Sequence, residues 1–92
     1  MNWLEIIELR SVNHDSGTLE KDLIRLMNKM DCEGKPQTFK VYKHGTVETD
    51  FSIHLHYDTE QAETSGSKSG LCLVSALKEF GLVNHSIWVE RK

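Results

Sequence analysis

The stretch VETDFSIHLHYD, residues 47–58, decides the fold of this 92-residue chain. From Asp50 onward, apolar side chains alternate with polar ones, which is the period-two pattern of a strand with one buried face. The apolar set is Phe51, Ile53, Leu55 and Tyr57, and the polar set is Asp50, Ser52, His54 and His56. One face of this strand therefore needs a hydrophobic core. The other face carries two imidazoles and is where chemistry is expected first.

The segments on either side of this strand predict five further elements. In chain order they are a strand over 3–12, a helix over 18–31, a strand over 38–43, a helix over 69–80 and a strand over 82–90. Thr18 is the expected N-cap of the first helix, whose apolar face combines Leu19, Leu23, Leu26, Met27 and Met30. His44-Gly45 is the expected turn between the two middle strands, and Gly81 the expected left-handed C-cap of the second helix.

The element order β-α-β-β-α-β predicts the fold class. It is the split βαβ, or ferredoxin-like, arrangement of an α+β protein. Right-handed crossovers place both helices on one face of a four-stranded antiparallel sheet with strand order 4-1-3-2. The length allows one domain, over residues 1–92.

Composition limits the partners and the compartment. The chain is 38% hydrophobic and 27% charged with a net charge of −3, so we expect neither nucleic acid nor a membrane surface as a partner. The first ten residues lack a basic segment followed by a long apolar run, so we expect no signal peptide or anchor. Cys32 and Cys72 are far apart and form no C-x-x-C pair, which favours a cytoplasmic location.

The sheet face opposite the helices is left open, and the strand alternation says which side chains it carries. They are Leu4, Ile6, Glu8, Arg10, Lys40, Tyr42, Asp50, Ser52, His54, His56, Ser86, Trp88 and Glu90. Leu4, Ile6, Tyr42 and Trp88 would form a larger apolar patch than a monomer usually exposes. We therefore expect these four residues to form a homodimer interface around a twofold axis.

A family resemblance accompanies this arrangement. A small β-α-β-β-α-β chain with a sheet free to dimerise resembles the dimeric α/β-barrel superfamily, which includes antibiotic-biosynthesis-monooxygenase-like proteins. The stretch from Asp50 to Asp58, a strand that ends in Tyr-Asp and leads into the second helix, looks like the corresponding region there. The resemblance covers most of the chain by element order and maps no catalytic residue. It implies a homodimer more than it implies an oxygenase.

A second resemblance points to a different class of function. Gly17-Thr18-Leu19 is similar to the step that opens the first helix of ACT regulatory domains, although Thr18 interrupts the Gly-Leu pair of that family. Such a domain binds a small effector and catalyses nothing. The same open face would then serve as a regulatory or protein-docking surface.

The pair His54-x-His56 is the strongest candidate for a chemical site. Two imidazoles on one strand face can bind a single divalent ion, with Glu8 of the neighbouring strand as a third ligand. The commoner alternative is a pair of polar residues in a dimer interface. His85 differs from both, because it alternates with apolar residues that face the helices. We expect it to be a hydrogen-bonded core histidine.

The segment Ser65-Gly66-Ser67-Lys68-Ser69-Gly70 precedes a helix and suggests an anion site at its N-terminus. It does not match G-x-x-x-x-G-K-[ST], so we exclude a Walker-type loop. The alternative is a loop that simply caps the helix.

The leading functional interpretation is a cytosolic homodimer that binds a small molecule or acts as a cofactor-independent oxygenase. Its ligand pocket would be lined by Tyr42, His54, His56 and Trp88, with His54 and His56 as the catalytic candidates. No nucleotide fingerprint occurs, and no cofactor is predicted. A non-enzymatic regulatory module and a metal-dependent enzyme remain the two alternatives.

Overall fold

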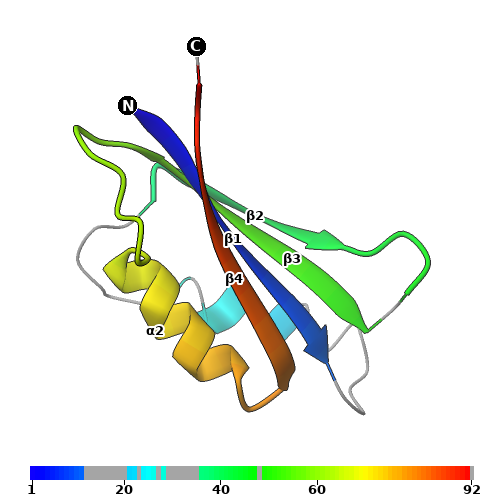
Figure 1. Cartoon of the computed structure of the whole chain (residues 1–92). Coiled ribbons are helices and arrows are strands. Elements are labelled where there is room, and N and C mark those ends of the chain that lie inside the picture. Colours follow the sequence, from blue (N-terminus) through cyan, green and yellow to red (C-terminus); the bar gives the residue numbers. More distant parts are fainter. Residues whose placement is uncertain (12–20, 23, 27, 29–35, 48, 92) are drawn as a thin grey trace.

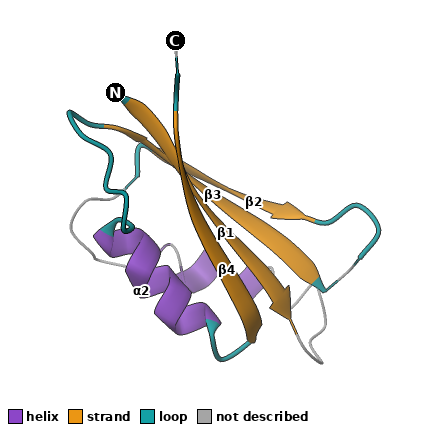
Figure 2. Cartoon of the chain, viewed as in Figure 1, coloured by secondary structure: helices purple, strands orange, loops and turns teal. Residues whose placement is uncertain are grey.

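The computed structural model describes residues 1–11, 21–22, 24–26, 28, 36–47 and 49–91. Its labelled elements are β1 (Asn2–Ser11), β2 (Thr38–Lys43), β3 (Asp50–Asp58), α2 (Lys68–Leu77) and β4 (Gly81–Val89) (Figure 1). Residues 21–22, 24–26 and 28 are also helical, within the first predicted helix (Figure 2). Thr18, Leu19, Leu23, Met27 and Met30, predicted for that helix, and Cys32 lie outside the described residues.

The four strands form one sheet in the order β2-β3-β1-β4. Every neighbouring pair is antiparallel, with Leu55 opposite both Glu5 and Phe39. This order is the predicted 4-1-3-2 order, and the α+β ferredoxin-like fold is confirmed. The predicted central strands, β1 and β3, lie in the middle of the sheet, where each pairs along both edges.

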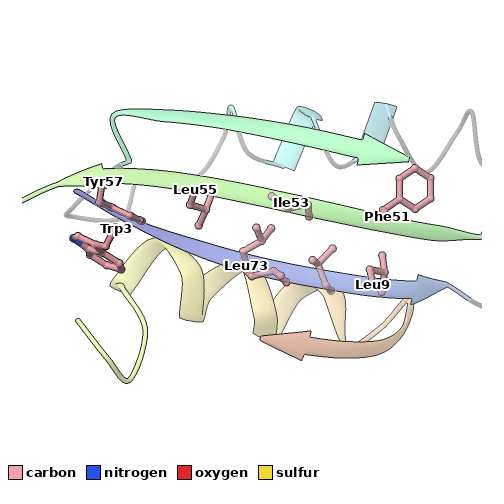
Figure 3. Packing of buried hydrophobic residues seen from close by; sticks show 9 residues of the cluster. Trp3, Leu9, Phe51, Ile53, Leu55, Tyr57 and Leu73 are labelled. Atoms are coloured by element: carbon pink, nitrogen blue, oxygen red, sulfur yellow. The ribbon is translucent and has the colours of Figure 1, made fainter. Parts of the chain in front are cut away.

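The core lies between the sheet and the helices (Figure 3). It consists of Trp3, Ile7, Leu9, Phe51, Ile53, Leu55, Tyr57, Leu73 and Leu77. The apolar residues of β1 and β3 alternate with less buried ones, as the period-two pattern predicts. Leu26, from the first helical segment, packs against the same cluster, so both helical segments share one face of the sheet.

The end of α2 differs from the prediction. The helix stops at Leu77 and its C-cap is Lys78, which has a right-handed helical backbone. Gly81 is instead the first residue of β4, opposite Ser11 of β1. A Cβ atom on Gly81 would lie 2.1 Å from the carbonyl oxygen of Arg10. The glycine is therefore needed for the close approach of two strands and does not cap the helix.

A helix must be long and apolar to cross a membrane. Among the described residues, no helix is long and apolar enough to cross a bilayer.

Candidate functional site

Three rows of side chains cross the open face, because residues that pair directly in antiparallel strands point to the same side. From β2 to β4 the rows are Thr38, His56, Leu4 and Trp88, then Lys40, His54, Ile6 and Ser86, and then Tyr42, Ser52, Glu8 and Asn84. All residues predicted for the ligand site and the dimer interface lie in these rows.

The aromatic residues of this face are open to solvent. The exposed fraction is 61% for Trp88 and 46% for Tyr42. Leu4 and Ile6, between them on the central strand, are half-buried by their neighbours. The face is therefore apolar in its middle and carries exposed rings toward both outer strands.

His54 has the most defined geometry on this face. Its Nε2 atom lies 2.9 Å from the Ser52 hydroxyl, and its ring centroid lies 4.6 Å from that of Tyr42 at a tilt of 52°. Burial lowers the pKa of His54, the neighbouring His56 lowers it further, and Glu8 opposes the shift. Near neutral pH the imidazole is therefore uncharged and able to accept a proton.

Two hollows lie at opposite ends of this face. One, of about 390 Å³, is lined by Glu8, Arg10, Tyr42, Asp50, Ser52 and Asn84 among others. The other, of about 640 Å³, is lined by Asn2, Leu4, Thr38, His56, Trp88 and Glu90 among others. The four predicted ligand residues do not converge on one pocket. Tyr42 belongs to the first hollow, His56 and Trp88 belong to the second, and the His54 row lies between the two.

The metal hypothesis rests on His54, His56 and Glu8. The two histidines share a face of β3, but Glu8 pairs with Ser52, one row away from His54. Among the described residues, no three histidine, cysteine or carboxylate side chains come close enough together to hold a metal ion.

A buried polar cluster on the opposite face was not predicted from the sequence. Glu5 is fully buried beneath the start of α2. Its carboxylate accepts hydrogen bonds from the Ser67 hydroxyl at 2.6 Å and the Ser67 backbone N–H at 3.2 Å. The Nε2 atom of His85 lies 2.5 Å from Oε2, the carboxylate oxygen that also accepts the Ser67 backbone N–H. His85 is therefore a hydrogen-bonded histidine on the core side of the sheet, as predicted, although its side chain is still 19% exposed, and its partner Glu5 was not predicted.

Ser67 joins this cluster to α2 and to β3. It is the N-cap of α2, and its side-chain oxygen accepts the backbone N–H of Gly70 at 2.9 Å. Because its single hydroxyl hydrogen goes to Glu5, the Tyr57 hydroxyl, 2.6 Å away, is the donor in that contact. Burial raises the pKa of Tyr57, the Ser67 bond opposes the shift, and Glu5 adds to it. The anion expected at this helix start is thus supplied by the chain itself.

One sequence signal points to this cluster. Glu5 stands in the buried phase of β1, between Trp3 and Ile7, where the alternation calls for an apolar residue. His85 stands in the corresponding phase of β4 and pairs with Ile7. A charged residue and a histidine in the core phase of adjacent strands predict a buried pair.

Comparisons with known proteins identify the fold. Neither protein-family models nor curated protein sequences give a match. Among solved structures, the chain is similar to a mutant form of SnoaB, a cofactor-independent oxygenase from Streptomyces nogalater, with a TM-score of 0.70 and 10% identity over 99% of this chain and 94% of that one. It is also similar to Rv0793 from Mycobacterium tuberculosis, with a TM-score of 0.63 and 15% identity over 100% and 97% of the two chains. The predicted fold-level resemblance to the dimeric α/β-barrel proteins is confirmed.

Proposed function

We propose that the protein is a homodimer that binds a small planar molecule on the open face of its sheet and oxygenates it without a bound cofactor. The observation that carries the proposal is the pair Tyr42 and His54, an exposed aromatic ring beside an uncharged imidazole at the edge of a hollow. The fold likeness to a protein described as a cofactor-independent oxygenase supports the same reading.

The chemistry of this pair suits a phenolic or enolisable ligand. A planar ring stacks against Tyr42, and its acidic hydroxyl hydrogen-bonds to His54. His54 accepts the hydroxyl proton because its imidazole is uncharged near neutral pH. The hydrogen bond with Ser52 fixes the orientation of that imidazole. The resulting electron-rich anion passes electrons directly to O2. In this scheme the substrate itself is the reductant.

The dimer contact follows from the apolar middle of the open face. Leu4 and Ile6 lie on the central strand with Trp88 and Tyr42 toward the two outer strands. A face-to-face contact would cover all four and would close the hollows from above. A ligand bound there would then be shielded from water, which strengthens its polar contacts.

Oxygen uptake with a naphthol as the probe tests the activity. One O2 is expected to be consumed for each naphthol converted into the corresponding quinone and one water. His54→Gln should abolish this uptake, whereas Glu79→Gln, beyond α2 and away from the open face, should leave it unchanged. Binding of the naphthol with no oxygen uptake by the unmodified protein would contradict the oxygenase and favour the non-enzymatic effector-binding class.

Sedimentation velocity tests the dimer. Ile6→Lys places a charge in the middle of the open face and should dissociate the face-to-face contact. Ile24→Lys makes the same change on an exposed helical residue and should not. Equal masses for the Ile6→Lys variant and the unmodified protein would refute this interface.

A further inference from the structure

The outer edge of β4 differs from the outer edge of β2. Both strands are at the limits of the sheet, so each presents one row of backbone groups that pairs with no other described strand. β2 is six residues long and carries Lys40 and Lys43, which discourage pairing with another chain. β4 is nine residues long and contains no proline and no acidic or basic residue except His85. An uncharged edge of this length is a natural site for strand pairing.

The residues of β4 are symmetric in character about His85. The run Leu82-Val83-Asn84-His85-Ser86-Ile87-Trp88 reads apolar, apolar, polar, histidine, polar, apolar, apolar. Two antiparallel copies of this run centred on His85 place apolar residues opposite apolar residues and polar residues opposite polar ones.

Pairing centred on His85 needs the backbone N–H and C=O groups of His85 to point away from β1, and they do. The N–H of Glu90 donates to the carbonyl of Asn2 on β1 at 3.0 Å, so the even-numbered residues of β4 point their backbone groups inward. The odd-numbered residues, Val83, His85 and Ile87, therefore point theirs outward. The outward N–H of His85 is held by the side-chain oxygen of its own neighbour Asn84 at 3.0 Å. That local bond is what a pairing strand would replace.

We infer that β4 pairs antiparallel with β4 of a second copy of this chain, with the twofold axis at His85. Val83 then forms a hydrogen-bonded pair with the partner's Ile87, and Leu82 faces the partner's Trp88. Leu82, 72% exposed, and Trp88, 61% exposed, are the most exposed large hydrophobic side chains among the described residues. Both side chains lie on the open face. In this register, Leu82 of each copy packs beside Trp88 of the other copy, and both lose exposure to solvent.

This edge contact differs in geometry from the face-to-face dimer, although Trp88 takes part in both. Its twofold axis is perpendicular to the sheet, whereas the axis of a face-to-face contact lies between two sheets. The edge contact alone gives a dimer with a continuous eight-stranded sheet. The two contacts together give an assembly larger than a dimer, a closed tetramer where their twofold axes intersect, so the mass of the unmodified protein distinguishes the two cases.

A charge-swap experiment tests the register. Leu82→Glu should halve the mass in sedimentation velocity, and the double variant Leu82→Glu with Trp88→Arg should restore it, because each Glu then faces an Arg of the other copy. Residues 82 and 88 lie about 20 Å apart along one strand, so the rescue cannot arise within a chain. A monomeric unmodified protein, an unchanged mass of the single variant, or a double variant that stays dissociated would each overturn the inference.

Amide exchange separates loss of pairing from loss of folding. The outward amides of Val83 and Ile87 should be protected in the unmodified protein and exchange freely in the Leu82→Glu variant. The inward amides of Asn84 and Ser86 should stay protected in both. The result that contradicts the edge contact is rapid exchange of the outward amides in the unmodified protein. The Ile6→Lys variant, which addresses only the face contact, should leave the outward amides protected.

Discussion

The two faces of the sheet each carry a histidine and a tyrosine, in different surroundings. On the helix-covered face, His85 contacts Glu5 and Tyr57 donates to Ser67, so both side chains are held by neighbouring polar groups. Among the described residues, no buried side-chain nitrogen or oxygen atom lacks one. On the open face, His54 contacts the half-buried Ser52 and the ring of Tyr42, and the Tyr42 ring is itself exposed to solvent.

The comparison shows that histidine and tyrosine stabilise the fold on the helix-covered face and are available to bind a ligand on the open face. A buried carboxylate is tolerated only where several donors converge on it, and such a network fixes the elements that supply them. Glu5 in this way ties β1, β4 and the start of α2 together. The open face has polar groups with unused hydrogen-bonding capacity beside exposed rings, which is what a ligand or a second copy requires.

Removal of Glu5 should have the largest effect on stability. Glu5→Ala leaves the buried Ser67 and the partly buried His85 without their acceptor, and we expect a loss of about 3–5 kcal/mol in the free energy of unfolding. Urea unfolding measures it. Glu8→Ala on the open face is the matched control and should change stability by less than about 0.5 kcal/mol. Similar losses for the two variants would mean that the Glu5 cluster has no structural role.

Gly70→Ala, a substitution in α2, should disrupt the hydrogen bonds of the same Glu5 cluster. A Cβ atom there would lie 2.0 Å from the Glu5 carboxylate oxygen, so the carboxylate or the helix must move. We expect Gly70→Ala to destabilise by about 1–3 kcal/mol, despite the better helix propensity of alanine. Gly45→Ala, with no neighbouring atom within 4 Å of its Cβ, should be near neutral in the same unfolding assay. A stabilised Gly70→Ala variant would show that the cluster is loosely packed.

Truncation of Tyr42 should separate binding from stability on the open face. We expect Tyr42→Ala to weaken binding of the fluorescent probe anilinonaphthalene sulfonate about tenfold, or about 1.4 kcal/mol. Its unfolding free energy should change by less than about 0.5 kcal/mol, because the ring is half exposed. Fluorescence titration and urea unfolding of the same samples give both values. Loss of stability without loss of binding would place Tyr42 with the structural residues.

The pH dependence from His54 should be the smallest effect. Its pKa lies below the ordinary 6.5, so the unfolded chain binds a proton more readily than the folded protein between the two values. Stability should therefore fall as pH decreases from 6.5 through the lowered pKa and then level off. The His54→Gln variant should lose this slope in unfolding measurements, and the histidine NMR titration should show a midpoint below 6.5. A midpoint above that value would contradict the burial of the ring.

Much of the fold was predictable from single strands. The alternation in β1 and β3 placed Ile7, Leu9 and the apolar residues of β3 on the core side, and the sheet order followed from the element order. His85 was assigned to the core on the same grounds. The anion expected at the start of α2 was predicted as an external ligand, because nothing local to residues 65–70 shows that Glu5, on β1, reaches it.

The two hollows illustrate the same limit on the open face. Strand alternation places Tyr42, His54, His56 and Trp88 on this face, but it cannot show that they line two hollows and not one pocket. The register puts Tyr42 and Trp88 in different rows at opposite edges of the sheet. A shift of two residues in either strand pairing would keep every side chain on its face and still change which residues meet.

The sequence by itself determined which face of the sheet each strand residue occupies, because side-chain direction follows from a period of two along one chain segment. Only the tertiary structure decided which residues from different strands become neighbours. Strand register and helix docking depend on contacts between segments far apart in the chain, such as Ser67 with Glu5. The core residues of the strands can therefore be predicted from the local alternation of apolar and polar residues. The Glu5 cluster, the Tyr42–His54 pair and the outward edge of β4 are products of the assembled sheet.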